Sequence, residues 1–286
     1  MDKIEILTRL SSSKQILSPF AFLPEVKKQG HTAALDIGVL KKSLEYISMV
    51  QNPDMIYSIN LYKSTLCGEC THQSIRELLE FYKIRAGRIV FEILEDDAGS
   101  GCPSQLESTS PFRIFPIQRQ QAIIHNKKPL IPDKVHDRRI CPCKEMPHLI
   151  LNESMQRFKD IYGMLFSVDD FPSGTNCMHN VYKMQGISYV KIDGIWLRNM
   201  LENFRIEFQE SEWEEIFLRE FHKILLEVRR IHPYVIFIVE RVEDEDLFNL
   251  FSKIEEIQYF QGYFFSKTKD INDIEGEIAE HNIKGV

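Results

Sequence analysis

The sequence is organised around residues 166–174, which read Phe166-Ser167-Val168-Asp169-Asp170-Phe171-Pro172-Ser173-Gly174. An apolar run stops there at two adjacent carboxylates, and the chain then turns. Successive side chains of a β-strand point to opposite faces, so two neighbouring carboxylates serve one site only where the strand ends and bends. We therefore expect Asp169 and Asp170 at a rim. Such a like-charged pair is either a solvated turn or a metal site.

Five other apolar runs carry a polar or charged residue at or near their C-terminal ends. These residues are Asn60, Glu92, Lys191, Glu240 and Gln261. Core strands do not need such residues, and the functional residues of (β/α) barrels lie at the C-terminal ends of the strands. The set predicts one common site.

The composition is that of a globular protein. The chain has 286 residues, 43% of them hydrophobic, which is enough for one large domain or two small ones. No apolar stretch approaches the roughly 20 residues of a membrane span, and Met1-Asp2-Lys3 leads directly into a strand-like segment without a signal-peptide pattern. We expect a cytoplasmic protein that does not enter a membrane. The net charge of −7 disfavours unspecific binding to nucleic acid polymers, so a phosphate substrate would need metal ions.

Strand-like segments alternate with helix-like ones along most of the chain. The predicted strands lie near Ile4, Met55, Arg88, Gly163, Tyr189, Tyr234 and Tyr259, and the predicted helices cover about 18–30, 33–49, 72–82, 153–162, 211–231 and 244–254. This alternation with short connections indicates a parallel sheet covered by helices. A closed barrel of this type has eight strands, so one strand is missing or hidden.

Residues 97–152 interrupt the alternation. The segment is rich in proline, serine and charge, and we expect no regular element in it. Loops of this length inside a compact domain are usually functional or disordered. The segment is interpreted as an insertion that serves as a lid, a surface for a protein partner, or a small metal-stapled subdomain.

The cysteines offer a second metal hypothesis. Cys67, Cys70, Cys141 and Cys143, with His72 nearby, provide enough ligands for a structural zinc ion. Both segments follow predicted strands at the same end of the barrel. The alternative is that these cysteines are simply buried, as free cysteines often are.

The rim residues resemble, in order, the motifs of EAL domains, the bacterial cyclic di-GMP phosphodiesterases. Glu5-Ile6-Leu7-Thr8-Arg9 resembles the Glu-Ala-Leu-x-Arg signature of that family. The later motifs follow in the family's order: Ile59-Asn60-Leu61, Phe91-Glu92-Ile93-Leu94-Glu95, Val168-Asp169-Asp170-Phe171, Val190-Lys191-Ile192-Asp193, Val239-Glu240-Arg241-Val242-Glu243 and Phe260-Gln261-Gly262-Tyr263.

The resemblance spans Ile4 to about Lys267 apart from the insertion. It implies an α/β fold over residues 1–286: a single TIM-like (β/α) barrel of the EAL type, with residues 97–152 inserted. The family's usual first strand is missing or replaced, and Phe112–Ile117 in the insertion is a candidate replacement.

The resemblance also implies a pair of divalent cations. Glu5, Asn60, Glu92 and Asp169 would hold the first, and Asp169, Asp170 and Glu240 the second. Oxygen ligands favour magnesium or manganese over zinc. Two such ions would clamp a phosphodiester and activate a water.

The other matched residues would act on water or substrate. Lys191 resembles the family's residue that positions the water or helps to deprotonate it, and Gln261 one that orients water or a ligand. Arg9 would bind a substrate phosphate, for which its planar fork is suited. Asp193 would lie near the guanine, and Glu95 and Glu243 would hold the Asp169-Asp170 loop and the metal ligands.

The implied function is hydrolysis of cyclic di-GMP to linear pGpG. Three departures support an alternative, a weak or inactive module that binds cyclic di-GMP or a protein partner: Pro172-Ser173-Gly174 stands where the family has Gly-Thr-Gly, the usual first strand is absent, and Arg241 replaces a glycine. In the family the Asp-Asp loop also contributes to dimerisation. The resemblance therefore implies a homodimer, and the changed loop is a departure that bears on it. Taken singly, matched residues such as Asn60, Lys191, Gln261 and Arg9 are more simply explained as turn or surface residues. Together, this explanation does not account for the match at every ligand position.

Overall fold

All seven predicted strands form one curled parallel sheet in the computed structural model, which describes residues 3–11, 16–50, 54–94, 147–173, 177–208 and 212–269. In sheet order the strands are β1 (Lys3–Ile6), β4 (Ile56–Tyr62), β5 (Ile89–Leu94), β6 (Leu165–Phe171), β7 (Tyr189–Ile192), β8 (Ile236–Val239) and β9 (Ile257–Phe260). Neighbouring strands are all parallel. The predicted TIM-like barrel architecture is confirmed.

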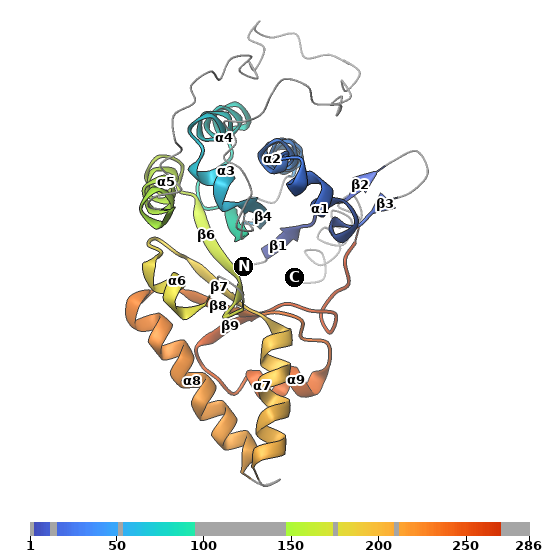
Figure 1. Ribbon diagram of the computed structural model, residues 1–286, viewed down its shortest axis with the longest axis vertical. Helices are drawn as coiled ribbons and strands as arrows, with labels where there is room; N and C mark the ends of the chain where they lie inside the picture. The colour runs from blue at the N-terminus through green and yellow to red at the C-terminus, as the bar shows by residue number, and fades with distance from the viewer. Residues whose placement is uncertain are drawn as a thin grey trace, which may run out of the picture.

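Helices cover the outer face of this sheet. They are α1 (Pro19–Lys28), α2 (Thr32–Met49), α3 (Lys63–Cys67), α4 (Glu69–Tyr82), α5 (Pro147–Tyr162), α6 (Met178–Lys183), α7 (Gly194–Glu207), α8 (Trp213–Ile231) and α9 (Glu245–Phe251). Figure 1 shows α2 to α5 gathered beside the first half of the sheet and α7 to α9 beside the second half. A short antiparallel pair, β2 (Leu10–Ser11) and β3 (Ile16–Leu17), precedes α1.

The two faces of the sheet bury different side chains because side chains alternate along each strand. The outer face contributes residues such as Ile59, Phe91 and Val190 to the main core, which the helices complete. The inner face carries a small second apolar cluster of Ile56, Val90, Tyr189 and Ile238. Two to four residues further along the strands, the inner face becomes polar, and the candidate site begins there.

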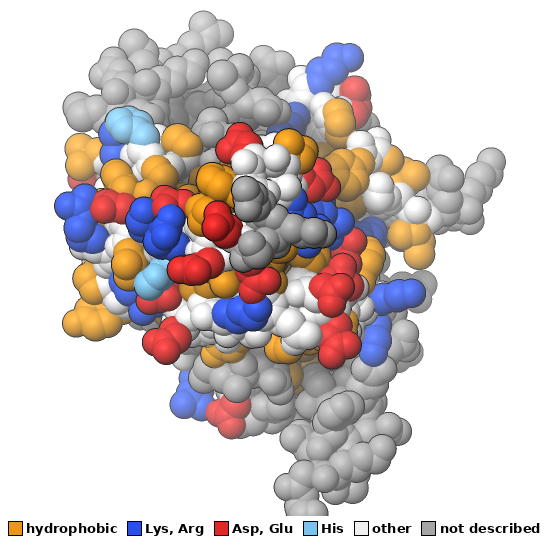
Figure 2. All heavy atoms as spheres, turned by 90° about the horizontal axis from the view of Figure 1, so that it is seen from below, with side chains coloured by type: hydrophobic (Ala, Val, Ile, Leu, Met, Phe, Trp, Pro, Cys, Tyr) orange, Lys and Arg blue, Asp and Glu red, His pale blue; other side chains and the backbone are white. Residues whose placement is uncertain are grey.

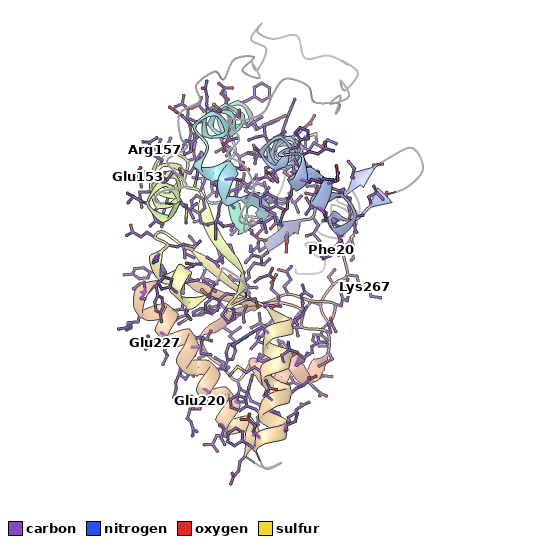
Figure 3. The ribbon with its side chains drawn as sticks, in the orientation of Figure 1. Phe20, Glu153, Arg157, Glu220, Glu227 and Lys267 are labelled. Atoms are coloured by element: carbon purple, nitrogen blue, oxygen red, sulfur yellow. The ribbon has the colours of Figure 1, made fainter. Side chains whose placement is uncertain are left out.

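Helix α8 illustrates how the sequence pattern produces the outer layer. Phe217, Phe221 and Leu225 are completely buried and recur at the spacing of one helix face. Glu220 and Glu227, labelled in Figure 3, lie on the outer side of the same helix. These three side chains belong to the main core that lies between the helices and the sheet.

The predicted elements differ from the structure at the start of one helix and in three helices that were not predicted. Helix α5 begins at Pro147, within the segment expected to lack regular structure. Proline can start a helix because the N–H group that it lacks would have no partner in the first helical turn. The sequence analysis also missed α3, α6 and α7. The first two are short, and α7 starts with Asp193 and Gly194, which are typical of a turn. Residues 97–146, including the candidate strand Phe112–Ile117, lie outside the described residues.

The sheet is an open barrel in the part of the chain that the structure describes. Its strand order starts at β1 and ends at β9, and no backbone ladder joins these two edges among the described residues. A side-chain hydrogen bond links the two ends instead: Gln261 Nε2 donates to Glu5 Oε2 at 2.8 Å. This arrangement agrees with the prediction that one strand of the usual barrel is missing or hidden.

The surface gives two further facts. No described helix has both the length and the apolar character needed to cross a membrane. On the face shown in Figure 2, acidic and basic side chains are interspersed, so that face offers no extended basic patch to a polyanion.

Candidate active site

The predicted rim residues meet at the C-terminal end of the sheet. Each comes from a different strand or from the residue that follows one: Glu5 (β1), Asn60 (β4), Glu92 (β5), Asp169 (β6), Lys191 (β7), Glu240 (after β8) and Gln261 (after β9). Parallel pairing aligns these positions, and Asn60 lies directly opposite Glu92. The structure brings the predicted residues together, and their roles as a functional site stay a prediction.

Lys191 occupies the centre of the cluster and contacts four carboxylates. Its Nζ atom lies 3.2 Å from Glu5 Oε2, 3.0 Å from Glu92 Oε2, 3.0 Å from Asp169 Oδ1 and 2.7 Å from Glu240 Oε1. The lysine side chain is 1% exposed and that of Glu92 is 0% exposed. Buried charges persist only when they are paired, so the lysine ammonium and the carboxylates require one another.

Two amides fix the orientation of Glu5. Asn60 Nδ2 donates to Glu5 Oε1 at 3.0 Å, and Gln261 Nε2 donates to Glu5 Oε2. The other polar atom of Asn60, Oδ1, is buried and accepts no hydrogen bond from the described residues. Buried polar atoms normally have a partner, so this oxygen is available to a ligand that the protein alone does not supply.

A β-bulge brings the adjacent carboxylates Asp169 and Asp170 to the same site. The expectation that the strand ends at this pair was wrong, because β6 continues to Phe171. The register with β7 shifts between Val168 and Phe171, and Asp170 has a left-handed φ of 50°. A bulge redirects one side chain, and aspartate tolerates the left-handed region better than most residues.

The bulge assembles a group that could hold a metal ion. Oxygen atoms of Asp169, Asp170 and Glu240 all lie within 4.8 Å of one another. Among the described residues, no other group of three or more acidic, histidine or cysteine side chains brings its ligand atoms this close together. Its donors are all carboxylate oxygens, which suit magnesium or manganese. Together with the open Oδ1 of Asn60, the donor set fits divalent cations.

The pKa values show how the cluster balances its charge. Burial raises the pKa of Glu240 to about 8 against the lowering effect of Lys191, and burial together with Asp169 raises the pKa of Asp170 to about 6. Burial alone would also raise the pKa of Glu5, but Lys191, Gln261 and Asn60 together lower it to about 2.

Lys191 itself stays protonated. Burial disfavours its charge, but Glu92, Glu240 and the other two carboxylates outweigh that effect and raise its pKa well above the usual value. Burial also raises the pKa of Glu92, although Lys191 opposes the shift. Without added cations, the excess negative charge of the cluster is therefore balanced by ammonium groups and by protons on carboxyls.

Two other predicted site residues, Arg9 and Asp193, follow strands β1 and β7. Arg9 is exposed, and its guanidinium donates to the Thr8 carbonyl at 2.9 Å. Asp193 caps α7 by accepting from the Ile195 N–H at 2.9 Å, and its second oxygen accepts from Ser173 Oγ at 2.9 Å. The cap ties the loop that follows Asp170 to the start of α7.

Glu243 pairs with an arginine of α7. Its carboxylate lies 3.0 Å from Arg198 Nη2, and the same nitrogen donates to the Arg241 carbonyl at 3.4 Å. The contact therefore holds the segment after Glu240 against α7. Glu95, which was given a similar role, lies outside the described residues.

The zinc hypothesis is only partly within the described residues. Cys67 and Cys70 are half-buried cysteines at the α3–α4 junction that form no disulfide, and the His72 ring packs against the Phe158 ring with centroids 4.2 Å apart. These three residues do not form a metal-binding group with one another. Cys141 and Cys143 are not among the described residues, so the zinc site stays a prediction.

Sequence reasoning missed one charged residue of the cluster. Lys3 lies on the same face of β1 as Glu5, and its Nζ is 3.0 Å from Glu92 Oε1. The period-two spacing of Lys3 and Glu5 was visible in the sequence. It could have indicated that both side chains enter the site.

Comparison with known proteins confirms the family resemblance. The EAL domain family matches residues 1–114. Over 277 residues, 96% of this chain, the sequence is 22% identical to cyclic di-GMP phosphodiesterase PdeF of Escherichia coli (strain K12). The chain spans 29% of the length of that relative.

Solved structures of EAL domains share the fold. The EAL enzyme Bd1971, in a form bound to cAMP and cyclic di-GMP, superposes with a TM-score of 0.64 at 15% identity, over 96% of this chain and 59% of that one. The FimX EAL domain from Pseudomonas aeruginosa, bound to c-di-GMP, gives a TM-score of 0.60 at 15% identity, over 92% of this chain and 82% of that one. The fold is that of an EAL domain.

Proposed function

We propose that this chain is a metal-dependent phosphodiesterase that hydrolyses cyclic di-GMP to linear pGpG. One observation carries the proposal: seven oxygen-bearing or cationic side chains, each from a different strand or the residue after it, converge at the C-terminal end of an EAL-type sheet. A buried amide oxygen there, Asn60 Oδ1, has no hydrogen-bond partner among the described residues. The homology to a cyclic di-GMP phosphodiesterase supports the choice of substrate.

The donor set assigns roles to the acidic residues. Glu5, Asn60, Glu92 and Asp169 would hold one divalent ion, and Asp169, Asp170 and Glu240 another. Such ions supply charge neutralisation at the phosphodiester and lower the pKa of an attacking water. Asp169 would belong to both sets.

The polar residues orient rather than ligate. Because Lys191 is held protonated by four carboxylates, we assign it to donating a hydrogen bond that positions water or substrate, not to accepting a proton. Gln261 holds the Glu5 carboxylate through its amide nitrogen, which leaves its Oε1 to face water or ligand.

Wild-type protein is expected to convert cyclic di-GMP to pGpG with manganese or magnesium at about pH 8, and to lose this activity in chelator. The measurement is chromatography of the nucleotides after incubation with the purified chain. Product formed equally well in excess chelator would contradict a metal-dependent reaction.

The same assay tests a second candidate function, a module that binds cyclic di-GMP or a protein partner without turnover. The altered loop after Asp170 favours this reading: Ser173 is tied to Asp193, and its N–H donates to the Asp170 carbonyl at 2.7 Å. Nucleotide binding by a folded, metal-loaded protein that yields no pGpG would establish it.

Arg9→Ala is expected to weaken cyclic di-GMP binding by about 1.5 to 3 kcal/mol, the range for hydrogen bonds to charged groups. Arg9 is exposed, and within the part of the chain that the structure describes its guanidinium donates only to the Thr8 carbonyl, so it is accessible to a phosphate. Calorimetry with cyclic di-GMP measures the loss, and manganese affinity should stay nearly unchanged. Unaltered nucleotide affinity would show that Arg9 does not contact the substrate. Arg219→Ala, on the exposed side of α8, is the matched control.

A further inference from the structure

A second lysine enters the acidic cluster, and its role is not explained by the proposed function. Lys3 projects from β1 on the same face as Glu5. Its side chain is 14% exposed, and its Nζ lies 3.0 Å from Glu92 Oε1 and 5.0 Å from the centre of the Tyr189 ring. An aromatic face stabilises a nearby ammonium group, so Tyr189 adds to the ion pair in fixing Lys3 there.

Lys3 and Lys191 together engage both oxygens of Glu92. Lys3 contacts Oε1 and Lys191 contacts Oε2, each at 3.0 Å, and the carboxylate is completely buried. Glu92 is a ligand of the first proposed ion. A divalent ion at that carboxylate therefore has to displace an ammonium group or lie close to two of them.

The second proposed position differs in this respect. Asp170 is exposed, and no ion pair with a lysine or arginine engages it in the described part of the chain. Its oxygen lies within 4.8 Å of oxygens of Asp169 and Glu240. Lys191 contacts Asp169 and Glu240 through one ion pair each, whereas Glu92 is engaged by two lysines, one on each oxygen.

We propose that Lys3 competes with a divalent cation for Glu92, so that the chain binds one ion tightly through Asp169, Asp170 and Glu240 and a second ion only weakly. The inference rests on the metal site of the proposed function, and it concerns how fully that site is loaded. It follows that full loading requires a higher metal concentration than binding of the first ion.

Titration of the metal-free 286-residue chain with Mn²⁺ tests this proposal. For the wild type we expect one tight site and a second site at least roughly tenfold weaker, because a fixed like charge at a few ångströms opposes the second ion strongly. Calorimetry gives the two affinities. Electron paramagnetic resonance gives an independent readout, since two manganese ions about 3.5 to 4 Å apart are exchange-coupled whereas a single ion is not.

Lys3→Met removes the ammonium group and keeps an apolar side chain against Tyr189. The weaker affinity should rise at least roughly tenfold in this variant, and the coupled spectrum should appear at correspondingly lower Mn²⁺. Lys28→Met is the matched control, because Lys28 is 79% exposed on α1 and pairs with Glu25 away from the site. Lys3→Gln, which retains a donor to Glu92 without the charge, replaces the methionine variant if that one does not fold.

Two results would overturn the inference. One is a wild type that binds two ions with equal affinity and gives a coupled spectrum from the first additions of manganese. The other is a second affinity that is the same in the wild type and in the folded Lys3 variant. Either result leaves the proposed phosphodiesterase intact. Absence of any manganese binding in wild type and variants would remove the metal site itself and the proposed function with it.

Discussion

Asp169→Asn is expected to abolish the hydrolysis of cyclic di-GMP and to weaken manganese binding. The asparagine keeps the shape of the side chain but removes the charge of the residue that both proposed ions share. Asp169 lies 3.0 Å from Lys191 and belongs to the oxygen group with Asp170 and Glu240. We expect turnover to fall by at least about 10²-fold, the scale seen when one preorganised electrostatic group is lost from an active site.

Turnover and manganese titration of this variant are measured side by side with Asp160→Asn. Asp160 lies on α5, where its Oδ1 accepts a hydrogen bond from Gln156, and its replacement makes the same chemical change away from the site. The control should behave like the wild type. Product that persists in Asp169→Asn would mean that the reaction takes place at another site or comes from a contaminating enzyme.

The fold was largely predictable because its signals are local and repeated. The seven strands recur as short apolar runs, and the polar residues that close them share one face of a parallel sheet. Glu92, Lys191 and Glu240 could therefore be assigned to one site from the alternation of side chains and the rule for (β/α) barrels. Their roles could be inferred only from the family motifs, since spacing alone does not distinguish a metal ligand from a surface residue.

The local backbone at the site could not be predicted in the same way. The bulge at Asp169 and Asp170 depends on the register with β7, which is a tertiary contact. The start of α7 likewise depends on tertiary packing: a Cβ on Gly194 would lie 2.3 Å from the Glu240 carbonyl oxygen, so glycine is required there. Read along the sequence alone, Asp193-Gly194 indicates a turn.

The pairing of Lys3 with Glu92 illustrates the same limit. The residues are 89 positions apart, and only the order β1–β4–β5 in the sheet brings the two side chains to one end. The sequence had indicated one lysine, Lys191, among the carboxylates of the cluster. The structure shows two ammonium groups in the cluster, and this changes the expected balance between bound cations and the protein's own charges.

Lys191→Met is expected to destabilise the metal-free protein by about 3 to 5 kcal/mol, the usual cost of removing one partner of a buried ion pair. The substitution leaves Glu5, Glu92, Asp169 and Glu240 without the ammonium group that lies within 3.2 Å of each of them. Part of the cost is offset because carboxyls in the cluster can take up protons. The loss should therefore be larger at pH 8 than at pH 5, since more carboxyls are ionised at the higher pH.

Manganese should restore much of the lost stability, because divalent ions supply the positive charge that the lysine provided. Urea denaturation in chelator and in excess Mn²⁺ measures both effects, and Lys28→Met controls for the loss of a lysine elsewhere on the chain. A loss of stability that came only from the cavity left by the shorter side chain would not depend on metal or on pH. A loss of stability that is the same in chelator and in manganese would thus show that Lys191 acts by packing, and that the carboxylates are not held together by charge. Recovery with manganese would instead show that the lysine and the metal ions neutralise the same carboxylates.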